Sequence, residues 1–113
     1  MRGSALIPEI GKAYFEVVWA SSRSVAPSIN SYIYIGRDIF GGNKGEHFFQ
    51  TPHSYEMHGD FAQLKDQSLR AQADVVLMQP NMVEVLYTID GLIKYLSDVR
   101  DKHGDLFGAK KHD

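Results

Sequence analysis

The segment 45–61, GEHFFQTPHSYEMHGDF, holds the densest group of side chains that could do chemistry. It contains His47, His53 and His58, which are three of the five histidines, together with Glu46, Glu56 and Asp60. Imidazole and carboxylate groups can bind zinc, and a histidine beside an acid can act as a general base. His53 and Glu56 would share one face of a helix, because they are three residues apart. A metal-dependent or small-ligand-binding enzyme using this cluster, with His47, His53, Glu56 and His58, is therefore one hypothesis.

The spacing in this segment matches no known catalytic or metal-binding motif. The sequence contains no H-E-x-x-H, no G-x-S-x-G and no cysteine. The glycines of FGGNKG (40–45) lack the spacing of a phosphate-binding loop and are typical of a hairpin turn, with Asn43 as a second source of positive φ. We therefore expect no catalytic residue, no metal and no cofactor.

A structural interpretation of the same segment is a strand followed by a short helix. Residues 46–50 have strand character, Thr51 is suited to cap a helix, and Pro52 is suited to its first position. Gly59 would then end the helix. Asp60 and Gln63 repeat the capping pattern before a second, weakly periodic helical segment.

Strands are predicted at 12–20 and 31–38, where β-branched and aromatic residues alternate. The linker between them is too short for a crossover helix, which favours an antiparallel pair. The third strand is 46–50. The apolar run 74–79 could be a buried strand or a helix segment, and we favour a fourth strand.

The clearest helix is predicted over 81–104. Its apolar residues recur at three- and four-residue steps and are Met82, Val85, Leu86, Ile89, Leu92, Ile93, Leu96 and Val99. Asn81 is expected to cap the helix and Gly104 to end it, and the solvent side pairs Asp90 with Lys94 and Asp98 with Lys102. Gly91 interrupts the pattern; close approach of another helix across a dimer axis would explain it, as would a tolerated surface glycine.

These elements predict an α+β fold, in which an antiparallel sheet of three or four strands has a long C-terminal helix packed on one face in two layers. We expect one domain over 5–108, since 113 residues is the size of a single core. Residues 1–4, MRGS, resemble the leader of an expression tag, and 109–113 are expected to be a frayed tail.

Strand alternation singles out a group of tyrosines. If Phe15, Val17, Trp19, Ile33 and Ile35 face the helix, then Tyr14, Tyr32 and Tyr34 lie on the opposite face of the sheet, with either Phe48 or both His47 and Phe49 beside them. Exposed tyrosines are typical of protein interfaces. Two alternatives are that residues 60–79 cover this face as ordinary core, or that it stacks single-stranded RNA bases, for which the basic rim is thin.

Composition narrows the function. The net charge is -2, which disfavours nucleic acid, and no apolar run approaches the roughly 18 residues of a membrane-spanning helix. A chain without cysteine suits the cytoplasm. The sequence thus favours a small cytoplasmic, non-enzymatic binding module that acts on a second copy of itself, as a homodimer, or on another protein, for example as an inhibitor or immunity-type protein. The expected binding residues are Tyr14, Tyr32, Tyr34, Phe48, His53 and His58.

Overall fold

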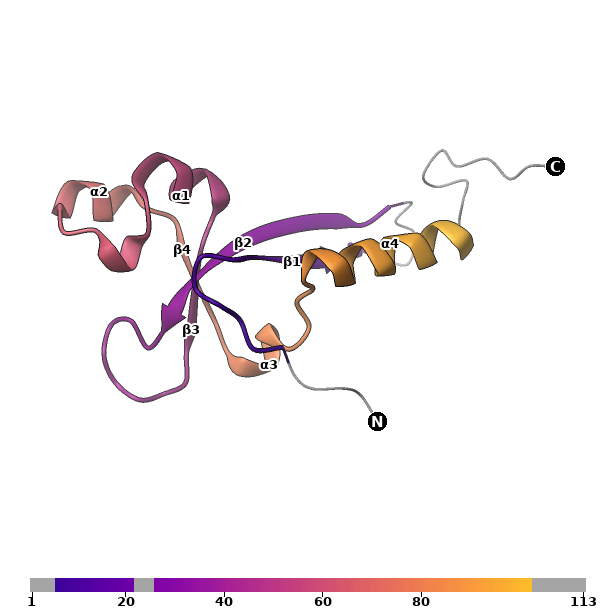
Figure 1. Cartoon of the computed structure of the whole chain (residues 1–113), viewed down its shortest axis with the longest axis horizontal. Helices are drawn as coiled ribbons and strands as arrows, with labels where there is room; N and C mark the ends of the chain where they lie inside the picture. The colour runs from indigo at the N-terminus through magenta and orange to yellow at the C-terminus, as the bar shows by residue number, and fades with distance from the viewer. Residues whose placement is uncertain (1–5, 22–25, 103–113) are drawn as a thin grey trace.

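The computed structural model describes residues 6–21 and 26–102. In this part of the chain the strands form one antiparallel sheet in the order β1-β2-β3-β4 (Figure 1). The strands are β1 (Ala13–Val18), β2 (Ser28–Arg37), β3 (His47–Gln50) and β4 (Val75–Met78). The α+β class and the antiparallel sheet are confirmed, and the run 74–79 is a strand. The expectations for residues 1–4, 109–113 and Gly104 concern residues outside the described ranges.

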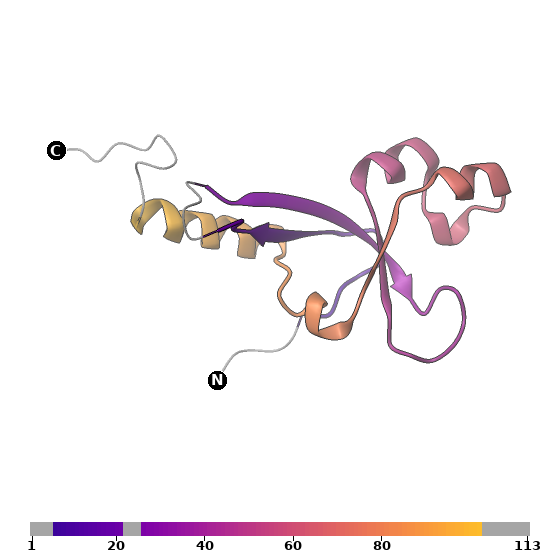
Figure 2. The same ribbon diagram turned by 180° about the vertical axis from the view of Figure 1, so that it is seen from behind.

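Helical segments connect β3 to β4 and follow β4. They are α1 (Pro52–His58), the 3-10 turn η1 (Phe61–Gln63), α2 (Gln67–Gln72), α3 (Pro80–Val83) and α4 (Ile89–Lys102). The segments α1, η1 and α2 connect β3 to β4 at one end, whereas α4 lies at the other end beside β1 (Figure 2). Among these described helices, none combines the length and apolar character that crossing a bilayer requires.

The capping signals around α1 act as the sequence predicts. Thr51 Oγ1 accepts a hydrogen bond from the Ser54 amide at 3.3 Å, which satisfies one of the open donors of the first turn. Gly59 has φ +80° and donates its amide to the Tyr55 carbonyl at 2.8 Å. Only glycine adopts that backbone conformation without strain, so α1 ends there.

The prediction of one continuous helix over 81–104 is wrong in its first part. The short helix α3 ends at Val83, and α4 begins only at Ile89. Between them, Tyr87 forms an isolated antiparallel bridge with Phe15, with backbone hydrogen bonds of 2.9 and 2.8 Å. These bonds satisfy the backbone amide and carbonyl of Phe15 at the edge of β1, which would lack partners if Tyr87 were helical. Tyr87 must be extended to form them, so the helix is interrupted there.

Thr88, and not Asn81, caps the long helix. Thr88 Oγ1 accepts from the Gly91 amide at 3.1 Å, and the Thr88 carbonyl accepts from the Leu92 amide at 2.8 Å. Asn81 lies inside α3 instead. Gly91 is therefore in the first turn of α4, where a Cβ atom would lie 3.3 Å from Thr88 Oγ1. Because Gly91 has no side chain, Thr88 Oγ1 can approach its amide without a close contact.

The inner side of α4 packs against the end of the sheet formed by β1. Leu92 and Val99 are buried. Trp19 Nε1 donates a 2.8 Å hydrogen bond to the hydroxyl of Tyr95, and the Tyr95 ring lies 5.2 Å from that of Tyr87. Trp19 thus contacts the C-terminal helix, as strand alternation predicts.

A bulge interrupts the regular pairing of β2. Two of its residues, Ile35 and Gly36, lie opposite the single residue Phe48 of β3. Gly36 has φ +137°, and a Cβ atom at this position would come within 2.9 Å of Ile39 Cγ2. Glycine is required here both for the backbone conformation and for the close approach of Ile39. The bulge changes which later side chains share a face with Tyr34.

Buried side chains occupy both faces of the sheet. One cluster contains Tyr14, Tyr34, Phe49, Met78, Val83 and Leu86, with Leu6, Tyr32 and Val76 packed against it. The other contains Ile35, Phe48 and Phe61, with Ile39, Tyr55, Ala73 and Val75 packed against it. Successive residues of a strand point to opposite faces, which separates the two clusters. Each face is therefore covered by residues from outside the sheet.

The expectation that the tyrosine face is exposed is wrong for two of its three residues. Tyr14 is 4% exposed and Tyr34 is 5% exposed, while Tyr32 is half-buried. Val83 and Leu86, which follow β4, cover them together with Leu6, whereas residues 60–79 contribute only Val76 and Met78 of β4 to this cluster. The alternation itself was correct, but it does not reveal that the chain returns over this face.

Phe48 does not accompany the tyrosines. It is 5% exposed and belongs to the cluster with Ile35 and Phe61, on the opposite face. Phe49 is the aromatic residue that packs with the tyrosines, and its ring centroid lies 5.1 Å from that of Tyr34. Of the two alternatives, His47 and Phe49 are the residues beside the tyrosines. The expected binding residue Phe48 points to the other face, because adjacent strand residues alternate.

Candidate functional site

The histidines of segment 45–61 are not brought together. His53 and Glu56 are exposed on α1, and His58 is half-buried at its last position. His47 lies on β3 and contacts Tyr34 instead. Within residues 6–21 and 26–102, no three histidine, aspartate or glutamate side chains are arranged to hold a metal ion. The cluster seen in the sequence is thus a strand followed by a capped helix, with its polar groups dispersed.

A buried glutamine organises the connection from β3 to α1 and η1. Gln50 is fully buried and donates from Nε2 to Ser54 Oγ and to the Gly59 carbonyl, each at 2.9 Å. Its Oε1 accepts from the Phe61 amide at 2.9 Å. Ser54, also buried, accepts from the Asp74 amide at 3.0 Å. The sequence interpretation missed this network, although a glutamine at the end of an apolar strand was its visible signal.

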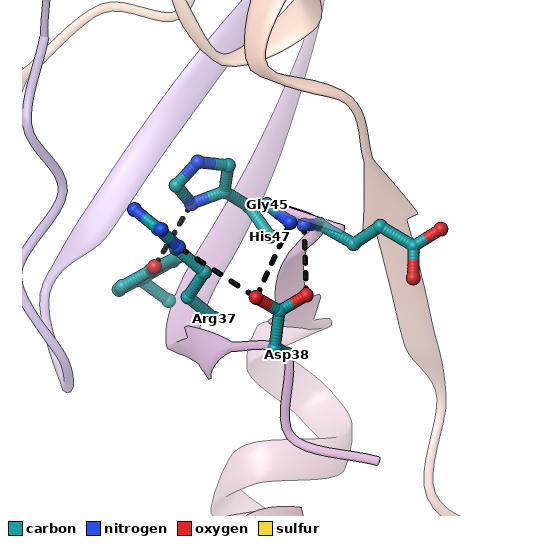
Figure 3. A network of polar contacts seen from close by, with 6 residues as sticks. Arg37, Asp38, Gly45 and His47 are labelled. Atoms are coloured by element: carbon teal, nitrogen blue, oxygen red, sulfur yellow. Dashed lines mark hydrogen bonds and ion pairs between the residues drawn. The ribbon is translucent and has the colours of Figure 1, made fainter. Parts of the chain in front are cut away.

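The bulge in β2 brings four polar side chains near one another (Figure 3). Beyond the bulge Arg37 pairs with His47, and the hydroxyl of Tyr34 lies 2.9 Å from His47 Nδ1. Bulges commonly re-aim side chains in this way. We call the resulting group of Tyr34, Arg37, Asp38 and His47 the bulge cluster and consider it as a candidate site.

Asp38 holds the loop that follows β2. It has φ +50°, and its carboxylate accepts from the amides of Gly45 at 3.2 Å and Glu46 at 3.1 Å (Figure 3). Its Oδ2 also lies 3.7 Å from Arg37 Nε. Asp38, rather than Asn43, is the non-glycine residue with positive φ in this hairpin. Both carboxylate oxygens are therefore engaged in fixing the loop.

The charges of the bulge cluster follow from its environment. Burial lowers the pKa of His47, and the positive charge of Arg37 lowers it further, against the opposing effect of Asp38. Burial raises the pKa of Tyr34. For Asp38, partial desolvation raises the pKa, but the amide hydrogen bonds from Glu46 and Gly45 outweigh it and the net pKa is lowered. At neutral pH a neutral phenol therefore contacts a neutral imidazole.

This arrangement is better suited to stability than to catalysis. In catalytic histidines a carboxylate often orients the imidazole and stabilises its protonated form, but the carboxylate of this cluster, Asp38, is bonded to backbone amides. The contact between Tyr34 and His47 instead satisfies the polar end of a phenol whose ring is in the core. We interpret the bulge cluster as structural: it satisfies the polar groups at the edge of the core cluster that contains Tyr34.

The folded protein should lose stability as the pH falls through the range in which His47 titrates. Its pKa is lowered from 6.5, so the unfolded chain binds a proton more readily than the folded chain. The stabilisation is complete above pH 6.5 and is lost as the pH falls through the lower, folded-state pKa. Urea unfolding from about pH 7.5 to about pH 5 should show this decline, and the variant His47→Gln should reduce its slope. An unchanged slope in His47→Gln would contradict this role.

Exposed apolar side chains recur along the segment that follows β4. Met82, Val85, Ile89 and Ile93 are 43%, 66%, 53% and 56% exposed, and we call them the outer apolar set. They follow one another at three- and four-residue steps through α3, the connecting turn and the first turns of α4. The sequence pattern had assigned them to the buried stripe. Breaking the helix at Tyr87 separated the stripe into an inner part and this outer part.

The fold and the two clusters define an α+β protein with a four-stranded antiparallel sheet over the described ranges. Comparison with protein-family models, with curated proteins and with solved structures finds no match to this chain. The function must therefore be argued from its own surface.

Proposed function

We propose that this chain is a protein-association module that forms a homodimer, and that the outer apolar set lies in the contact surface. The observation that carries the proposal is the exposure of Met82, Val85, Ile89 and Ile93, each 43% or more, in one short stretch of chain. Apolar side chains scattered singly over a surface are ordinary, but several from adjacent turns are typical of an interface.

The contact is proposed on α3 and α4 and no longer on the sheet. The rings of Tyr14 and Tyr34 are already buried within the chain, and Tyr32 donates its hydroxyl to Glu16 Oε1 at 3.1 Å. These tyrosines support the surface from beneath, since the core cluster they form includes Val83 and Leu86 of the covering segment. The mechanism is burial of apolar area and involves no chemical step. A cytoplasmic location belongs to the same proposal and rests on the cysteine-free sequence alone.

The double variant Ile89→Ser, Ile93→Ser should weaken dimerisation strongly and leave the monomer folded. Both side chains are more than half exposed, so their loss should change the unfolding free energy of the monomer by less than about 0.5 kcal/mol. In a symmetric dimer four isoleucines disappear from the contact, so the dissociation constant should rise by about thirtyfold or more. Light scattering coupled to gel filtration measures the mass.

Met57→Ser is the matched control. Met57 is 63% exposed but lies on α1, at the other end of the molecule (Figure 1). Met57→Ser also removes exposed apolar surface, but away from the proposed contact, so the mass profile should not change. If Met57→Ser dissociates the dimer and the isoleucine variant does not, the contact surface is at the α1 end and our assignment is wrong.

A further inference from the structure

The outer side of α4 carries two apolar and two charged residues in a repeated order. Ile89 is followed by Asp90, and Ile93 is followed by Lys94; all four are exposed. Residues four apart lie one turn apart on the same face of a helix, so the isoleucines form one short row and the charges form a second row along its flank. Leu92 and Val99 point to the opposite, buried side.

The two charged residues are available for a partner. Within residues 6–21 and 26–102, the ion pairs are Arg37 with Asp38 and Arg100 with Asp101, so Asp90 and Lys94 are not paired with each other despite their helical spacing. The sequence had predicted that pair. An exposed acid and an exposed base, each beside an exposed isoleucine, form a surface of complementary charge.

This surface is complementary to a copy of itself in one orientation. A two-fold axis between the turns of Ile89 and Ile93 would run two α4 helices antiparallel and place each Ile89 against Ile93 of the other copy. Because both charges lie on the same flank, Asp90 would then face the second copy's Lys94, and every contact would occur twice. A parallel two-fold arrangement would put the charged rows of the two copies on opposite sides of the dimer, so Asp90 and Lys94 would have no oppositely charged partner there.

We propose that a second copy of this chain binds here, with its α4 antiparallel to the first and with two symmetric Asp90–Lys94 ion pairs flanking the isoleucines. This inference rests on the proposed self-association and adds its orientation and its specificity. The charged pairs select the register, and the isoleucines supply most of the affinity.

Reversing one charge at a time tests the orientation. Asp90→Lys would place two lysines opposite each other at both pairs, and Lys94→Asp would place two acids there. Each variant alone should weaken dimerisation by about tenfold, and by less at high salt. Mixing the two variants should restore association, because in the heterodimer both pairs again have opposite charges. The double variant Asp90→Lys, Lys94→Asp should also dimerise like the wild type.

Rescue by mixing separates this effect from damage to the helix. Asp90 lies in the first turn of α4, where an acid favours the helix and a lysine does not. A variant that merely weakened α4 would not regain affinity when mixed with its counterpart. Glu56→Lys, an exposed acid on α1, is the matched control and should leave the dimer unchanged.

The possible results are distinguished by sedimentation equilibrium of all these forms. If the wild type dimerises and the single reversals do not weaken it, the antiparallel arrangement is overturned while self-association stands. A parallel contact gives this result, because its two charged flanks do not meet. Weakening without rescue in the mixture also overturns the arrangement. If the wild type is a monomer throughout, the self-association and this inference fall together.

Discussion

Replacing Gln50 with alanine should lower the free energy of unfolding by about 4 kcal/mol, which is a large part of the stability of a small domain. The side chain is 0% exposed and makes three hydrogen bonds of 2.9 Å. Its removal leaves the Phe61 amide and the Gly59 carbonyl without these partners, and it opens a cavity beside β3. Urea denaturation followed by circular dichroism measures the change.

Gln72→Ala is the control for this prediction. Gln72 is exposed at the end of α2, so alanine there should change the stability by less than about 0.5 kcal/mol. Gln50→Glu keeps the size of the side chain but replaces the donor Nε2 with an acceptor, and it should also be strongly destabilising. A loss below about 1 kcal/mol in Gln50→Ala would show that η1 and α1 dock without this network.

Phe49→Ala should cost about 4 kcal/mol, which places it beside Gln50→Ala as the most damaging substitution we predict. Phe49 is 0% exposed and lies in contact with all three tyrosines of its face. Its ring meets those of Tyr14, Tyr32 and Tyr34 edge-on, at centroid distances of 6.4, 6.0 and 5.1 Å. Alanine would remove these contacts and leave a cavity at the centre of the sheet.

The comparison for Phe49 is another phenylalanine with ring contacts but little burial. Phe40 is 62% exposed, although its ring lies 5.1 Å from that of Phe48 and 5.7 Å from that of Phe61. Phe40→Ala should cost less than about 1.5 kcal/mol, because most of its surface is already in water. Equal losses in the two variants would contradict the placement of Phe49 at the centre of the core.

Local signals in the sequence predicted most of the elements. Thr51 and Gly59 bound α1 because a hydroxyl cap and a positive φ each act within one turn. The alternation in 12–20 and 31–38 predicted β1 and β2, although β2 extends from Ser28. Such signals depend on neighbouring residues only, which explains their reliability.

The errors arose where contacts distant in sequence decided the structure. Nothing near Tyr87 indicates that Phe15 would pair with it, yet this bridge divides the predicted helix and moves the cap to Thr88. Val83 and Leu86, which cover Tyr14 and Tyr34, come just before this bridge in the chain. Tertiary pairing overrode a strong helical pattern here, and alternation alone could not show which face would be covered.

The candidate site was the least predictable part. The histidines were candidates because imidazole can act as an acid, a base or a metal ligand. Of the three in segment 45–61, His47 alone makes a polar side-chain contact with another candidate residue, Tyr34. That contact depends on the bulge at Ile35 and Gly36. A bulge changes the register by one residue, and the sequence marks it only by a glycine. The outer apolar set was visible in the sequence, but it was assigned to the core.

Sedimentation equilibrium of the unmodified chain over a wide range of concentration tests self-association most directly. We predict a reversible equilibrium between monomer and dimer, with the average mass rising towards twice the 12.7 kDa of one chain. A mass that stays at one chain at every concentration would show that Met82, Val85, Ile89 and Ile93 face water in the working protein, and the proposal would be wrong.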